Sequence, residues 1–145
     1  MLLTGPTIAR LEARVPVLRG RVAGAASLAD LLARDAMPEQ TPAAHVIPSD
    51  ITGGAETALT GLYRQSVQRQ ITVMLTLRSH DASGRRALET LEDLLEEIVT
   101  AVAGWSPEPT ATPFSLRRCR LLRFAAGTFV YEISFSLTDH LRITP

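Results

Sequence analysis

The chain contains no lysine and no asparagine, and it has a single cysteine and few aromatic residues. Cys119 alone cannot form an internal disulfide or a thiolate zinc site, so the chain is compatible with a reducing compartment. The net charge is zero, because fifteen arginines balance fifteen acidic residues. This balance removes the long-range electrostatic argument for a protein that binds nucleic acid or anionic membranes. A charged binding surface would therefore have to be local.

Long apolar segments are missing as well. Stretches without a charged residue reach about ten residues, against the ~18 residues that indicate a membrane-spanning helix. The first residues include neither a basic segment nor an apolar segment long enough for a signal peptide. We therefore expect no membrane partner and no secretory leader.

What is present is the composition of an ordinary globular domain. The 145 residues are 46% hydrophobic and 21% charged, which is enough to build a core without disulfides or metal ions. We predict a single domain over residues 1–145.

The apolar periodicity predicts three helices. A short one near the N-terminus ends at Pro16, and a second begins at Ser27, where Asp30 completes a capping box. The third covers Ala82–Ala103 and carries a continuous apolar stripe. Trp105 follows the helix stop and is expected to fold back over this stripe.

Alternation of apolar and polar residues predicts the strands. Short strands are expected over 21–25 and 43–47, and a longer one over Val67–Arg78. Leu116–Phe124 and Thr128–Leu137 should form a hairpin. The fold class is thus α+β: one mixed or antiparallel sheet of about four to five strands, with one long and two short helices packed on one side.

A long connection, Ser49–Gly61, is predicted to be a flexible loop. It exceeds the usual connection of about 4–6 residues, and such loops are commonly functional. Gly53 and Gly54 allow bending, while Ile51 and Leu59 supply apolar atoms that a solvated linker would not need. We expect this loop to contact a partner in an assembly.

Two charged segments are candidate interface residues. Five acidic residues lie on the outer face of the long helix and include three like-charge pairs four residues apart: Glu89, Glu92, Asp93, Glu96 and Glu97. Four arginines crowd the first strand of the hairpin: Arg117, Arg118, Arg120 and Arg123. Both segments are either solvated faces or the two sides of a head-to-tail contact between copies.

Nothing in the sequence has the pattern of an active site. His45, His80 and His140 are far apart and lack a second ligand at helical or strand spacing, so we expect structural histidines. Cys119 is expected to be a small buried hydrophobe rather than a nucleophile. Phosphate-binding and nucleophile-elbow motifs are missing. We expect no enzyme, no cofactor and no metal.

Four segments carry a family resemblance by their order and spacing: PAAHVIP at 42–48 before the glycine-containing loop, QITVML at 70–75, the block from Asp81 to Pro107, and the hairpin that ends FSLT at 135–138. From about Ile8 to Arg142 the chain resembles the tail terminator proteins of long-tailed bacteriophages. These include proteins of Mu-like phages and of gene transfer particles.

The resemblance implies a structural role in the virion, at the head-proximal end of the tail. Such a protein is expected to form a homo-oligomer, a hexameric ring, that caps the tail tube, stops its polymerisation and meets the head–tail connector protein. It would be assembled in the cytoplasm of the bacterial host. Genomic DNA would pass through the lumen without sequence readout.

Two alternatives remain at this point. A neck or head-completion ring protein would bind the portal side and leave tube polymerisation unaffected. A small nucleic-acid-binding regulator is the alternative from a different class, supported by the arginine-rich strand alone.

Overall fold

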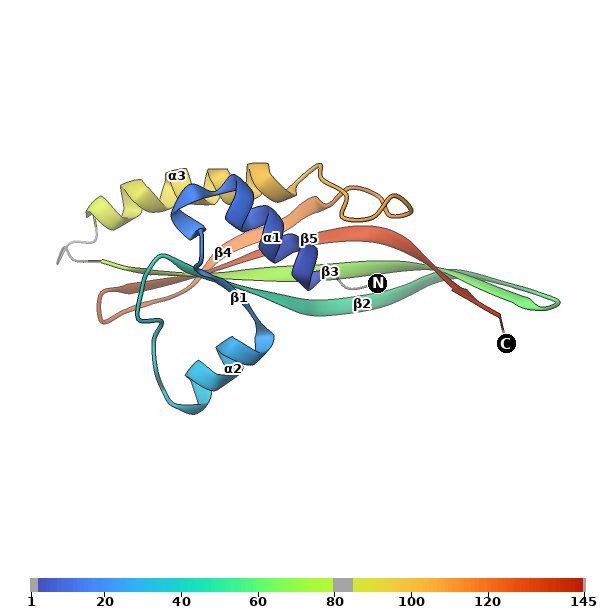
Figure 1. Cartoon of the computed structure of the whole chain (residues 1–145), viewed down its shortest axis with the longest axis horizontal. Coiled ribbons are helices and arrows are strands. Elements are labelled where there is room, and N and C mark those ends of the chain that lie inside the picture. Colours follow the sequence, from blue (N-terminus) through green and yellow to red (C-terminus); the bar gives the residue numbers. More distant parts are fainter. Residues whose placement is uncertain (1–2, 80–84, 145) are drawn as a thin grey trace.

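The computed structural model describes residues 3–79 and 85–144 of the chain. Three α-helices and five strands are present there and confirm the α+β class (Figure 1). A 3₁₀ turn at Pro16–Leu18 follows the first helix. In chain order the elements are α1 (Thr4–Arg14), β1 (Val22–Gly24), α2 (Ala25–Ala33), β2 (Ala43–Leu59), β3 (Leu62–Arg78), α3 (Arg85–Val102), β4 (Ser115–Ala125) and β5 (Thr128–Ile143).

The strands form one mixed sheet in the order β1-β2-β3-β5-β4. β1 is parallel to β2, and every other pair is antiparallel. β3 and β5 pair without a register shift from Tyr63↔Ile143 to Arg78↔Thr128. The two longest ladders, β2–β3 and β3–β5, thus form the spine of an elongated molecule (Figure 1).

The core lies between the sheet and the helices α1 and α3. Alternate residues of β3 and β5 face it, as the period of two requires, and the apolar stripe of α3 covers them. The largest contributors are Ile71, Val73, Leu75, Ile133, Phe135, Leu91, Leu94 and Ile98. No helix in the described ranges is long and apolar enough to cross a membrane.

The C-terminal end of α3 is held by a reversal at Gly104, whose φ of +81° suits glycine. The Gly104 N–H donates to the carbonyl oxygen of Phe114 at 2.8 Å. Trp105 is partly buried against the core, with its ring 6.0 Å from that of Phe114. The prediction that Trp105 folds back over the helix end is confirmed.

Helix α2 differs from the prediction in two ways. It lies on the face of the sheet opposite α1 and α3, so the three helices do not share one side (Figure 1). Its N-cap is Gly24, without a side-chain cap bond, so the expected capping box does not form. Ser27 instead places its hydroxyl 3.5 Å from Nε2 of His45, a buried residue of β2. This contact links the helix to the second face of the sheet.

The expected loop over Ser49–Gly61 is wrong, because β2 continues as a strand to Leu59 and turns directly into β3. Register shifts at Pro48/Asp50 and Gly53/Glu56 absorb the residues that suggested a loop. A Cβ at Gly54 would lie 3.1 Å from the backbone oxygen of Ser66, so glycine permits this close approach. We call residues 50–70 the β2–β3 arm, which extends beyond the helices (Figure 1).

The predicted terminal hairpin is confirmed. β4 and β5 are joined at Ala126 and Gly127, whose φ angles of 52° and 74° match a type I′ turn. β5 runs on to Ile143, further than predicted, because its end pairs with the arm rather than with β4.

Candidate assembly interface

The acidic residues of α3 form a surface directed away from the core. All five are exposed, while Leu91 and Leu94 between them are buried and Leu95 is partly buried. The side chains of Glu92, Asp93, Glu96 and Glu97 make no ion pair within 4 Å in the part of the chain described. This concentration of like charge lowers the stability of an isolated helix by a few tenths of a kcal/mol per pair, about 0.2–0.5. We call these five residues the acidic face.

Two arginines of α1 lie next to the acidic face. Arg10 and Arg14 line a groove of about 470 Å³ together with Asp93, Glu96 and Glu97. Arg10 Nε–H donates to the carbonyl oxygen of Ala101 at 2.9 Å, and its guanidinium lies 5.2 Å from the ring centre of Trp105. Desolvation, and then the charge of Arg14, lower the pKa of Arg10. The groove thus combines both signs of charge.

Sequence reasoning missed these two arginines. Their spacing of four residues places them on one side of α1, but nothing in the sequence says that α1 packs on α3. The acidic face is therefore partly balanced within the chain near its C-terminal end.

The four arginines of β4 form a second surface, which we call the basic edge. All are exposed. Arg118 pairs with Ser134 and Arg120 with Glu132, so these side chains point to the face opposite the core. Arg120 Nε lies 3.6 Å from Glu132 Oε1 in a half-exposed ion pair, a type that contributes little to stability. Arg123 pairs with Val130 and points the same way, and Arg117 lies at a register shift, so the acidic face and most of the basic edge lie on opposite faces of the sheet.

The other side of β4 carries exposed apolar groups that sequence reasoning did not single out. They are about 41–50% exposed, and Phe124 stacks on Phe129 with ring centres 4.2 Å apart. Because β4 is an edge strand with one neighbour, nothing flanks them on its outer side among the described residues. The set comprises Leu116, Leu121 and Phe124, and the exposed Leu122 lies beside them at a register shift.

The expectation of a buried Cys119 is wrong, because Cys119 is exposed on this edge strand. Its register partner is the buried Ile133, but β4 lies at the margin that the helices leave open. Partial desolvation raises the pKa of its thiol, so the thiol is protonated at neutral pH.

The arm presents the remaining candidate residues. Ile51 and Leu59 are 63% and 64% exposed, and Gly53 and Gly54 sit in the irregular stretch between them. Tyr63 donates its hydroxyl hydrogen to Glu56 at 2.9 Å, and this bond to a carboxylate raises the pKa of Tyr63. The candidate residues of the arm are therefore exposed, as a partner contact requires.

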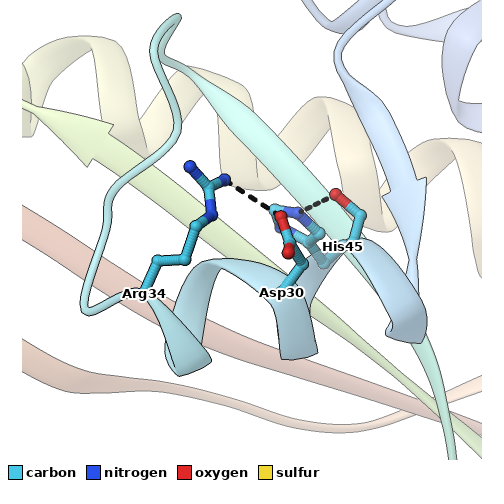
Figure 2. A network of polar contacts seen from close by, with 4 residues as sticks. Asp30, Arg34 and His45 are labelled. Atoms are coloured by element: carbon cyan, nitrogen blue, oxygen red, sulfur yellow. Dashed lines mark hydrogen bonds and ion pairs between the residues drawn. The ribbon is translucent and has the colours of Figure 1, made fainter.

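His45 lies beneath α2, near the ion pair between Arg34 and Asp30 (Figure 2). Its side chain is buried, and burial lowers its pKa. Its Nδ1 has no hydrogen-bond partner among the residues that the structure describes. His140 is exposed on β5, and His80 lies outside the described residues. Over residues 3–79 and 85–144, no group of three histidine, cysteine or acidic side chains is arranged to hold a metal ion.

Comparisons with known proteins give a consistent result. No curated protein matches the sequence. Among solved structures, a chain from the virion of a native gene transfer agent particle has a similar fold, with a TM-score of 0.56 and 11% identity, over 96% of this chain and 95% of that one. The model of the phage tail terminator protein family matches residues 1–145. The chain therefore belongs to the phage tail terminator family, as its sequence resemblance predicts, and is a structural protein of phage-type virions.

Proposed function

We propose that this protein assembles into a hexameric ring that caps the tail tube at its head-proximal end. The ring stops tube polymerisation and offers its other side to the head–tail connector protein. The observation that carries this proposal is the separation of the acidic face and the basic edge on opposite faces of the sheet, together with membership of the tail terminator family.

The separated charges favour a head-to-tail contact between copies. Because the two patches lie on opposite faces of the sheet, a two-fold contact through either face would bring the patch on that face against its own copy, like charge against like. Contacts between two different surfaces avoid this repulsion, and they close into a ring when the rotation per subunit allows it. Each charged surface then binds a surface of opposite sign on a neighbouring copy or on a partner protein.

A terminator also needs two chemically different ends. One end of the elongated molecule carries the tip of the arm, and the other carries the β4–β5 turn (Figure 1). The arm end exposes Ile51, Leu59, Leu141 and Ile143. The turn end exposes Phe124 and Arg123. A ring of parallel copies would therefore present one surface to the tube and a different one to the connector, and DNA would pass through its lumen without sequence readout.

The test is the length of tail tubes. The tube protein of the same tail is polymerised with and without this protein, and lengths are measured by electron microscopy. We expect short, capped tubes with a ring at one end, and unlimited tubes without the protein. If the protein leaves tube length unchanged but forms rings that bind the connector, a neck ring protein would be favoured instead.

The arginines of the basic edge favour one further alternative, a nucleic-acid-binding regulator. Such a protein would remain a monomer and retard DNA or RNA in a gel, with affinity that falls steeply with salt. A double-stranded DNA fragment added to the purified protein separates this alternative from the ring.

A further inference from the structure

The sheet has two long edges that lack a partner strand in the described structure. β4 pairs with β5 on one side and has no neighbour on the other over Ser115–Ala125. β1 covers β2 only from Ala44 to Val46, so the outer edge of β2 from Ile47 to Leu59 is also open. These edges have similar lengths and lie at opposite sides of the sheet.

Open edges of this kind expose unpaired backbone N–H and C=O groups, and soluble proteins usually protect them. β4 carries exposed apolar side chains along its length and contains no proline. A long edge strand with exposed apolar residues is a site for pairing with another strand. The exposed backbone and apolar side chains of β4 thus favour a partner that is itself a β-strand.

The outer edge of β2 matches β4 face by face at Asp50 and Ile51. On the core side of the sheet, β2 carries Ile51, which lies in a groove with Val67 and Arg69, and β4 carries Leu121 and Phe124. On the opposite side, β2 carries Asp50, which pairs with Gln70, and β4 carries its arginines. Ile51 would thus meet apolar groups and Asp50 would meet bases, whereas Glu56, which pairs with Gln65, lies on the core side.

The charges of the two edges are complementary overall. Residues 47–59 contain Asp50 and Glu56 and no arginine, whereas β4 contains four arginines and no acidic residue. Pairing of β4 with a second β4 would set these arginines against each other, and like charges across strands are destabilising. Pairing of β4 with β2 removes that repulsion.

We infer that the β4 edge of one copy pairs with the outer β2 edge of the next copy, so that the sheet continues from subunit to subunit. This contact rests on the ring of the proposed function. Its direction follows from the topology: β2–β3, β3–β5 and β5–β4 are each antiparallel, so β4 runs opposite to β2. Copies related by rotation, with their sheets edge to edge, therefore meet as antiparallel strands. The ladders place Ser115 level with Asp50, so the strands must tilt against the ring axis, as in a closed barrel, to bring the open edge of β2 beside β4 of the next copy.

Cys119 makes this contact measurable, because it is the single cysteine of the chain and lies exposed on β4, on the core side. One preparation keeps Cys119. Separate preparations carry Cys119→Ser with one new cysteine on the same side of β2: Ile51→Cys, Glu56→Cys or Ala58→Cys. Thr52→Cys, again with Cys119→Ser, is the matched control, because Thr52 points to the opposite side. A disulfide or a short bis-maleimide link requires close approach on one side of the sheet.

The two preparations are mixed, assembled, oxidised or treated with the linker, and separated without reductant. We expect a covalent product of Cys119 with at least one of the three new cysteines, several-fold more abundant than with Thr52→Cys. If the protein assembles but no position shows such an excess, the proposed strand contact is wrong, while the proposed ring is not contradicted. A dominant Cys119–Cys119 product in the native protein overturns it in favour of a two-fold contact. Protein that stays monomeric contradicts the ring, and this contact with it.

Discussion

Trp105 and Phe114 contact each other both through their rings and through a backbone hydrogen bond. Their rings lie 6.0 Å apart, and the Phe114 N–H donates to the carbonyl oxygen of Trp105 at 2.8 Å. Because Arg10 of α1 stacks on the same indole and bonds to Ala101 of α3, this pair connects α1, the end of α3 and the segment that leads into β4. The relative position of the acidic face and the basic edge depends on this junction.

Replacement of the indole should lower stability. For Trp105→Ala we expect a loss of about 2–3 kcal/mol in the free energy of unfolding, somewhat below the ~3–5 kcal/mol of a fully buried aromatic, because the ring is partly exposed. Urea unfolding followed by circular dichroism measures it. Trp105→Phe keeps a ring against Phe114 and should lose less than half as much. A loss below about 1 kcal/mol for the alanine variant would mean that the indole does not hold the junction.

Reversal of the acidic face should block assembly. The variant Glu92→Arg, Asp93→Arg, Glu96→Arg, Glu97→Arg places positive charge where a basic partner surface is expected, so the assembled fraction should fall at least ten-fold. The matched control, Glu92→Gln, Asp93→Asn, Glu96→Gln, Glu97→Gln, removes the attraction without adding repulsion and avoids crowding Arg10 with new arginines. It should assemble at intermediate levels.

Sedimentation of the two variants beside the native protein measures assembly, and circular dichroism checks the fold of the monomer. High salt should weaken native assembly most and the neutral variant least. Equal assembly of the reversed and native proteins, with equal salt dependence, would rule out charge pairing on α3.

The buried His45 predicts a loss of stability in mild acid. Its pKa is lowered by burial in the folded state, so the unfolded state takes up the proton first, near its ordinary value of 6.5. This contribution to stability is complete above that pH and declines as the pH falls below it, by at most about 1.4 kcal/mol per pH unit. His45→Gln should flatten the pH profile of unfolding between about pH 6.5 and 5.

The matched control for this experiment is Ser27→Ala. It removes the 3.5 Å contact to Nε2 but keeps the histidine buried under α2, so its pH profile should retain the native slope. If His45→Gln keeps that slope as well, the acid sensitivity arises from other groups.

Trimming of the arm should separate folding from assembly. Gly53 pairs with Val67, so Gly54–Ser66 can be replaced by an Asn-Gly turn that joins those two residues. The deleted strand residues of β2 are exposed, so we expect the melting temperature to stay within a few degrees. Assembly should be lost, because Leu59 and nearly half of the open β2 edge are removed. Rings of normal size from the trimmed chain would show that the arm is dispensable.

Much of the fold follows from periodicity along the sequence. The stripe on α3, the alternation in β3 and β5, and the Ala126-Gly127 turn are local signals, and each gives the element that the structure contains. The side of the sheet on which α2 packs cannot be predicted from local sequence signals. In the structure α2 contacts His45, whose neighbours in sequence are apolar but whose own side chain points away from the core toward Ser27.

The arm shows the limit of composition as a guide. Pro48, Gly53 and Gly54 suggest a loop, yet β3 supplies an uninterrupted partner strand and bulges accommodate all three. Cys119 shows the same limit for burial, because an apolar pattern does not say whether a strand is central or at an edge. The sequence identifies the candidate charges, but the strand register of β4 and the packing of α3 on the core determine the faces on which they lie.

The size and symmetry of the purified particle test the central claim most directly. Native mass spectrometry, with electron microscopy of the same sample, should give a six-copy particle with six-fold symmetry and a central channel. A monomer that persists at concentrations of tens of micromolar, or a closed two-fold dimer without a channel, would contradict the account.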